Sequence, residues 1–260
     1  MNRWAGWVLA GLGWMVWAGC GGSTEPELSD GAMGTQPLPQ LPPKRPTTDP
    51  KINAYLDQVV KVYADAKTYR DRGTVVEVEV AGDRTQETRR RFQTLYQRPD
   101  RFRLEIERLG PDGEPVEREV YWTDSGPGTL IVVAGNPPER RETTMLDGLS
   151  LTDPLAKVVP RLLIKEIAPG HRRTLDRMEL PELSEETVEV DGRPCRKFTG
   201  SYDGAETEAY LDAETMLVRK VVQRSSRQGS RTETTITYEP EVNGEIAAEE
   251  FGDPPTEASE

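Results

Sequence analysis

Residues 186–238, ETVEVDGRPCRKFTGSYDGAETEAYLDAETMLVRKVVQRSSRQGSRTETTITY, decide the fold of this chain. Turn signals divide the stretch at Asp191-Gly192, Asp203-Gly204, residues 212–215 and Gln228-Gly229. Asp and Gly favour the left-handed backbone that tight hairpin turns require. The segments between the turns have the length and composition of strands, at 186–190, 195–201, 206–211, 217–224 and 231–238. Successive strands joined by short turns predict an antiparallel meander.

A second group of strands is expected upstream of this meander. Val76, Val78 and Val80 alternate with glutamates in 74–80, and apolar and charged residues alternate again in 101–108. This period of two is typical of antiparallel strands with one buried face and one solvated face. The sequence PDGEP at 111–115 indicates a hairpin turn. The other strands expected here are 87–97, 116–123, 129–134 and, more weakly patterned, 174–180.

Helices are expected on either side of the first strands. Asp49 followed by Pro50 is typical of a helix start, and apolar residues then recur at intervals of three and four up to residue 66. We expect this helical region to end by Gly73. The apolar segment 145–164 predicts one or two short helices, with a start near Pro154 and a kink or break at Pro160.

These pieces predict an α+β fold. They amount to about nine to eleven strands and two or three helical segments, and one curved antiparallel sheet covered by helices accommodates all of them.

The first twenty residues predict export and lipidation. Arg3 precedes 14 uncharged residues, 4–17, which is within the ~7–15 residues of a signal-peptide core and short of the ~20 needed to span a bilayer. Ala18, Gly19 and Cys20 resemble the lipobox of bacterial lipoprotein signal peptides. The resemblance implies cleavage after residue 19 and acylation of Cys20, and two or more acyl chains anchor a protein stably. An ordinary secretory signal and an uncleaved anchor are the alternatives.

The rest of the chain divides into a linker, a folded domain and a tail. Residues 20–50 comprise the lipidated cysteine and a proline-rich segment with almost no periodic apolar pattern, which predicts a disordered tether. The folded domain is expected over 51–252 and a disordered tail over 253–260. Gly21, in place of an aspartate after the cysteine, favours the outer membrane facing the periplasm over the inner membrane.

Charge and cysteine content exclude some classes of function. The chain has 45 acidic and 33 basic residues and a net charge of -12, which disfavours binding to nucleic acid or to anionic lipid surfaces. If Cys20 is lipidated, Cys195 has no intrachain partner, so a disulfide framework is not expected.

Five segments of the domain carry distinctive motifs: YADAKTYRDRGTV at 63–75, DGRPCRKFTG at 191–200, AYLDAETMLVRKVV at 209–222, TTITYEP at 234–240 and IAAEEFGDPP at 246–255. Together they resemble the motifs of the LolA/LolB-like superfamily of lipoprotein carriers and receptors. Asp212, Thr215, Leu217 and Lys220 match the family's Asp-x-x-Thr turn and the following strand, and Phe251 matches its terminal phenylalanine. The resemblance covers roughly 51–255. It implies an incomplete β-barrel with a helical lid, whose concave apolar face binds acyl chains or lipoproteins.

The alternating apolar residues of the strands are the candidates for lining such a cavity. A filled core beneath the helices would produce the same pattern, and the sequence does not separate the two alternatives. The candidate ligand-binding residues are Val76, Val78, Phe102, Leu104, Ile106, Trp122, Tyr210, Val218 and Tyr238.

The sequence provides no sign of catalysis. His171 lies in the loop-like context Pro-Gly-His-Arg-Arg, and Cys195 lies in an expected strand, where a buried inert thiol is the usual outcome. Phosphate-binding glycine loops, nucleophile elbows and zinc-protease motifs do not occur in the chain. We therefore expect no catalytic residues, no metal and no cofactor.

Two functional hypotheses remain. The first is a monomeric, lipid-anchored, non-catalytic envelope protein that binds an apolar ligand, either an acyl chain or the lipid of a lipoprotein. The second is a protein-interaction or envelope-sensing module on the same scaffold with a filled core.

Overall fold

The fold is described from a computed structural model. It describes residues 49–124, 129–135, 139–144, 147–148, 154–164, 175, 178–202, 204–227 and 229–254. The leader, Cys20, most of the linker, His171 and residues 255–260 lie outside the described residues, so the predictions about them stay predictions. The described elements all belong to one compact unit, Pro46–Glu260, which contains the whole hydrophobic core described below. A unit with its own core has the property that allows a domain to fold alone.

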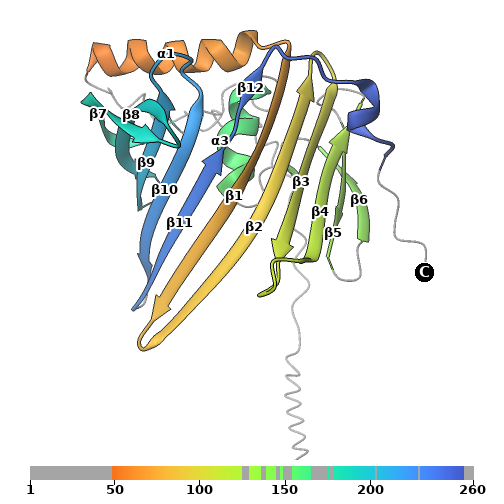
Figure 1. Cartoon of the computed structure of the whole chain (residues 1–260), viewed down its shortest axis with the longest axis horizontal. Helices are drawn as coiled ribbons and strands as arrows, with labels where there is room; N and C mark the ends of the chain where they lie inside the picture. The colour runs from red at the N-terminus through yellow and green to blue at the C-terminus, as the bar shows by residue number, and fades with distance from the viewer. Residues whose placement is uncertain are drawn as a thin grey trace, which may run out of the picture. The chain divides into compact units, whose positions relative to one another are not determined.

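One antiparallel sheet of 12 strands dominates this unit (Figure 1). The strand order is β6-β5-β4-β3-β2-β1-β11-β10-β9-β8-β7, with β12 paired to β1. Within the described chain, β6 and β7 are the two edges and do not pair with each other, so the barrel is incomplete and the predicted fold class is confirmed. The strands are β1 (Thr68–Ala81), β2 (Arg84–Gln97), β3 (Arg101–Leu109), β4 (Pro115–Thr123), β5 (Leu130–Ala134), β6 (Glu139–Thr143), β7 (Glu179–Val190), β8 (Arg193–Tyr202), β9 (Ala205–Asp212), β10 (Val218–Arg227), β11 (Ser230–Tyr238) and β12 (Glu241–Val242).

Helix α1 (Pro50–Asp65) begins where the sequence predicts. The Asp49 side chain accepts a 2.8 Å hydrogen bond from the Lys51 backbone N–H, and Pro50 occupies the first turn, where its missing N–H costs nothing. The helix buries one stripe of apolar residues in the core: Ile52, Tyr55, Leu56, Val59, Val60, Tyr63 and Ala64. Figure 1 shows α1 lying across one end of the strands.

Helix α3 (Pro154–Leu163) covers the same core and packs against α1. It starts at Pro154, as predicted. The sequence predicted a kink or a break at Pro160, and the helix runs through Pro160 without a break. The helix has only ten residues, and Pro160 lies in its second turn, where only the one hydrogen bond that a backbone N–H would donate is lost. The packing of Val158, Val159, Leu162 and Leu163 in the core compensates for that loss.

Strand β1 begins earlier than the sequence pattern indicates. Helix α1 ends at Asp65 and β1 starts at Thr68, so Gly73 lies inside a strand rather than at the end of a helical region. Its neighbours across the sheet are Phe92 on β2 and Tyr238 on β11. A Cβ at Gly73 would lie 2.0 Å from the Thr237 carbonyl oxygen and 2.5 Å from the Phe92 ring, so only glycine fits there.

The predicted hairpin turns are confirmed where the structure describes them. Asp191 and Gly192 both have positive φ, 48° and 74°, as a tight turn between β7 and β8 requires. The Asp212 side chain accepts hydrogen bonds from the backbone N–H groups of Glu214 and Thr215. The sequence did not indicate β6, whose residues are nearly all charged, and it placed the start of β7 too late.

The two faces of the sheet differ in what covers them. The face that carries Tyr69, Val75, Phe92 and Leu104 packs in one core cluster with α1 and α3, and we call it the inner face. The opposite face is called the outer face. None of the helices in the described part of the chain combines the length and apolar composition that crossing a membrane requires.

Candidate functional site

The inner face contains five of the nine residues predicted to bind an apolar ligand. Phe102, Leu104 and Ile106 follow one another on β3 at intervals of two, so their side chains share one face. Val218 on β10 and Tyr238 on β11 belong to the same core cluster. All five are less than 5% exposed, because α1 and α3 pack over this part of the sheet.

The other four predicted residues lie on the outer face, and their expected place on the concave face is wrong. Val75 belongs to the core cluster, and successive side chains of a strand point to opposite faces. Val76 and Val78 therefore lie on the face opposite to Val75. The same reasoning applies to Trp122 and Tyr210, whose neighbours Tyr121 and Ala209 lie in the core. The valine pattern misled because the inner-face positions between these valines are Glu77 and Glu79, beyond the reach of the helices.

One arginine connects both helices to the sheet. Arg98 follows β2, and its Nε donates a 2.8 Å hydrogen bond to the carbonyl of Ala66, just after α1. Its Nη2 donates a 2.8 Å bond to the carbonyl of Leu163, the last residue of α3. A guanidinium is well suited to the unpaired carbonyl groups at helix ends. Arg98 therefore holds the carboxyl ends of both helices that cover the inner face, and no sequence pattern indicated it.

A polar cluster lies beneath α1 within this otherwise apolar core. Asp71 is 1% exposed and lies directly across from Thr94. One of its carboxylate oxygens accepts a 3.1 Å hydrogen bond from the Thr94 N–H, and the other accepts a 2.7 Å bond from the Tyr69 hydroxyl. Burial raises the pKa of Asp71 to about 6, although the hydrogen bonds from Thr94 and Tyr69 oppose this shift.

Two further tyrosines complete this cluster. The hydroxyl of Tyr63, on α1, accepts a 2.9 Å hydrogen bond from the backbone N–H of Val218 beside an irregularity in the β9–β10 pairing. Tyr238 is also buried, and its hydroxyl has no hydrogen-bond partner among the residues that the structure describes. Burial raises the pKa of Tyr238 well above its usual value, and the nearby Asp71 and Tyr63 raise it further.

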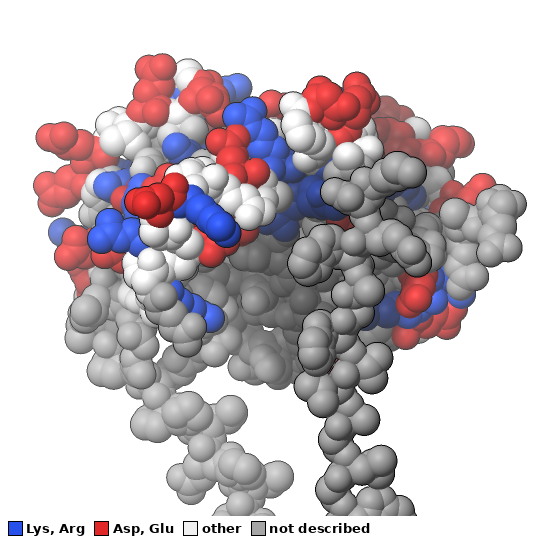
Figure 2. Space-filling view, turned by 90° about the horizontal axis from the view of Figure 1, so that it is seen from below, with Lys and Arg blue, Asp and Glu red and all other residues white. Residues whose placement is uncertain are grey.

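The inner face becomes charged toward the end of the strands opposite α1. Glu77 accepts a 3.3 Å hydrogen bond from the Thr234 hydroxyl, and Glu119 accepts a 2.8 Å bond from the hydroxyl of Tyr121. Arg90 is partly buried, which lowers its pKa, while Glu77 and Glu119 act in the opposite direction. Figure 2, which views the molecule from below Figure 1, shows acidic and basic side chains interspersed over the described surface. The inner face is thus apolar near α1 and polar at its other end.

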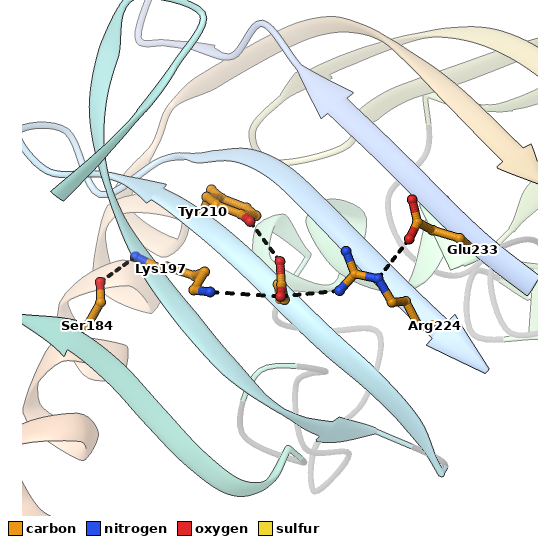
Figure 3. Close-up of polar contacts among 6 residues, drawn as sticks. Ser184, Lys197, Tyr210, Arg224 and Glu233 are labelled. Carbon is orange, nitrogen blue, oxygen red and sulfur yellow. Dashed lines mark hydrogen bonds and ion pairs between the residues drawn. The ribbon is translucent and has the colours of Figure 1, made fainter. Parts of the chain in front are cut away.

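The outer face is stabilised by cross-strand polar contacts. Figure 3 shows a row that runs across β8, β9, β10 and β11. Glu208 accepts hydrogen bonds from Tyr210 at 2.7 Å and from Arg224 at 3.2 Å, and it lies 3.8 Å from the Lys197 ammonium. Arg224 also donates a 2.7 Å bond to Glu233. Tyr210 is therefore part of a surface hydrogen-bond network.

The outer face also holds one small apolar cluster, in which the C-terminal segment packs on the sheet. Phe251, Leu95 and Ile246 are buried together. The carbonyl of Phe251 accepts hydrogen bonds from Arg103 at 2.9 Å and from the Trp122 indole at 3.2 Å. Trp122 thus contributes to attachment of the C-terminal segment.

The described residues show no arrangement suited to metal binding. Among them, no three His, Cys, Asp or Glu side chains come close enough to hold an ion. Cys195 is fully buried, and burial raises the pKa of its thiol. The burial that the sequence predicted for this thiol is therefore confirmed.

No protein-family model and no curated protein matches the sequence. Solved structures of similar fold include Mycobacterium tuberculosis lipoprotein LppX, with 10% identity, a TM-score of 0.42 and coverage of 77% of this chain and 99% of that chain. A LolA superfamily protein from Nitrosomonas europaea has 12% identity, a TM-score of 0.33 and coverage of 78% and 97%. The Pseudomonas aeruginosa MucA/MucB complex has 15% identity and a TM-score of 0.42, and the match covers 78% of this chain but only 61% of that chain. At these identities and TM-scores, neither a family nor an activity of this chain follows from the matches.

Proposed function

We propose that this protein is a monomeric, lipid-anchored and non-catalytic envelope protein that binds an apolar ligand on its inner face, either an acyl chain or the lipid of a lipoprotein. The leader and Cys20 support the anchor, and Gly21 favours the outer membrane facing the periplasm. The binding proposal rests on the way in which α1 and α3 cover the inner face. Two helices lie over an apolar sheet face, and both are connected to the sheet at their carboxyl ends by Arg98.

The energetics of binding would come from burial. Each CH₂ group that leaves water contributes ~0.8 kcal/mol, so an acyl chain can replace the contacts that α1 and α3 make with the inner face. The Arg98 bonds to Ala66 and Leu163 are few and partly exposed. They can break without loss of the sheet, which is held by its own hydrogen bonds.

The dense packing of the inner face favours a second candidate function. Phe102, Leu104, Leu130 and Phe198 are each at most 1% exposed, as in an ordinary filled core. If the helices never leave this core, the molecule is a protein-interaction or envelope-sensing module, and its binding surface lies elsewhere.

Mass spectrometry tests both parts of the proposal. The full chain, produced in a Gram-negative host and purified from membranes, should have the intact mass of a protein that begins at Cys20 and carries acyl groups. The unit Pro46–Glu260, purified without detergent and extracted with organic solvent, should release a stoichiometric acyl lipid. A unit that releases no lipid and binds none when lipid is added would support the interaction module instead.

A pair of variants makes this test specific to the inner face. Leu104→Trp adds bulk to the fully buried inner face, and Val78→Trp adds the same bulk to the outer face. We expect the first to abolish lipid recovery and the second to leave it unchanged. Equal recovery from both variants would contradict binding on the inner face.

A further inference from the structure

The buried hydroxyl of Tyr238 lacks a partner in a place where the surrounding polar groups are paired. Tyr238 is 3% exposed, and its hydroxyl makes no hydrogen bond within the described part of the chain, whereas the hydroxyls of Tyr63 and Tyr69 both do. Buried polar atoms are nearly always hydrogen-bonded, and each exception requires an explanation. A phenylalanine would fill the same space without a buried unpaired hydroxyl, so packing does not explain the tyrosine.

We propose that Tyr238 and Asp71 bind the hydroxyl group of a neutral amphiphile whose acyl chain lies along the apolar inner face. This inference rests on the proposed lipid-binding function and specifies which polar group the ligand carries. The two residues come from neighbouring strands, β11 and β1, and both side chains lie on the inner face.

The local structure holds the Tyr238 ring in place. Tyr238 lies across from Gly73 on β1, and Phe92 lies across from Gly73 on the other side. Because Gly73 has no side chain, the two rings meet over it in an edge-on arrangement, with centroids 5.4 Å apart. Asp71 lies two residues before Gly73 on β1 and therefore on the same face, so it is the diagonal neighbour of Tyr238 across the β1–β11 pair.

The chemistry of the pair selects a neutral hydroxyl group. The Tyr238 O–H can donate a hydrogen bond to a ligand oxygen, and the Asp71 carboxylate can accept one from a ligand O–H. A hydroxyl fulfils both roles at once. An ester lacks the donor, and an anionic head group would be repelled by the carboxylate. The bonds from Thr94 and Tyr69 already compensate much of the Asp71 charge, which disfavours a cation as the preferred ligand.

Displacement of a fluorescent apolar reporter, bis-ANS, from the unit Pro46–Glu260 tests the inference. The competitors are monoolein, methyl oleate and oleylamine, which share one monounsaturated hydrocarbon chain and differ in the polar group. We expect monoolein to bind more tightly than methyl oleate, which has no hydroxyl to donate to Asp71 and is therefore not held beside Tyr238. We expect Tyr238→Phe to reduce this ratio about tenfold, mainly by weakening monoolein binding. Tyr210→Phe, which removes a phenol from the outer face, is the matched control and should keep the wild-type ratio.

The outcomes separate this inference from the proposed function. If methyl oleate binds and Tyr238→Phe leaves the ratio unchanged, the hydroxyl site is overturned and lipid binding stands. If oleylamine binds more tightly than monoolein, the preferred ligand is a cation and the inference is overturned. If no competitor displaces the reporter, the proposed function fails. Thermal unfolding supplies an independent test, since Tyr238→Phe should be at least as stable as wild type, and a clear loss of stability would indicate a structural partner for the hydroxyl.

Discussion

The inner and outer faces of the sheet consist of the same strands, yet they are stabilised in different ways. On the inner face, side chains such as Phe102 are removed from water beneath α1 and α3. On the outer face, pairs such as Arg224 and Glu233 remain 43% and 51% exposed. Buried apolar contacts contribute several times more free energy than exposed ion pairs. The effect of a substitution should therefore depend more on the face it alters than on the number of contacts it removes.

The largest expected effect is on the inner face. Phe102 is 1% exposed, so Phe102→Ala should lower the free energy of unfolding by about 3 to 5 kcal/mol, through lost burial and the cavity left behind. Chemical denaturation of the unit Pro46–Glu260 measures this change. Val80→Ala is the control on the outer face, where Val80 is 39% exposed, and it should change the free energy by no more than about 0.5 kcal/mol. Similar losses in the two variants would contradict the distinction between the faces.

The next effect depends on pH and is also confined to the inner face. The pKa of Asp71 is raised to about 6, above the ~3.9 of an unfolded aspartate, so folding favours its protonated form. This contribution is fully present below pH ~4 and is lost as pH rises through about 6. The wild-type free energy of unfolding should therefore fall by up to about 3 kcal/mol between pH 4 and pH 7, relative to Asp71→Asn.

Parallel denaturation series of the two proteins measure this difference. Asp212→Asn is a suitable contrast, because hydrogen bonds from Thr215, Glu214 and Arg219 outweigh burial and lower the pKa of Asp212. Between pH 4 and pH 7 that variant should differ from wild type by a constant amount, because the contribution of the Asp212 carboxylate is fully present above pH ~4 and is lost only as pH falls through its lowered pKa. A flat difference between wild type and Asp71→Asn would show that Asp71 is solvated in the folded protein.

The successive hairpins and their turns could be predicted because their causes are local. Asp191 and Gly192 specify a tight turn by their own backbone preferences, and Asp49 caps α1 with its own side chain. The assignment of residues to faces was less reliable. In β1, valines alternate with glutamates from residue 76 onward, but Tyr69, Asp71 and Val75 determine the inner face. The helices cover only the first half of that strand, so the alternation of valines and glutamates in its second half does not indicate which side faces the core.

The site residues that the sequence missed, or assigned to the other face, depend on distant contacts. Arg98 acquires its role from the carbonyls of Ala66 and Leu163, which folding brings to it. Trp122 is buried on the outer face because the C-terminal segment returns to it at Phe251. Asp71 is a charged residue between two arginines of β1, and the packing of the core around it, together with the hydrogen bond from Tyr69 on the same strand, makes it a buried carboxylate. Pattern analysis of a single segment cannot reveal such pairings.

The smallest expected effect is on the outer face, and it tests whether exposed ion pairs contribute little to the stability of the sheet. Arg224 bonds to both Glu208 and Glu233, so it makes more polar contacts than most surface residues (Figure 3). A double-mutant cycle with Arg224→Ala and Glu233→Ala should nevertheless give a coupling free energy of only about 0.2 to 1 kcal/mol, because water solvates both groups in the folded and unfolded states. This coupling should shrink further in 1 M salt, where the Debye length is about 3 Å. A coupling above about 2 kcal/mol would mean that the outer network stabilises the sheet as strongly as a buried pair, and the contrast between the two faces would then be wrong.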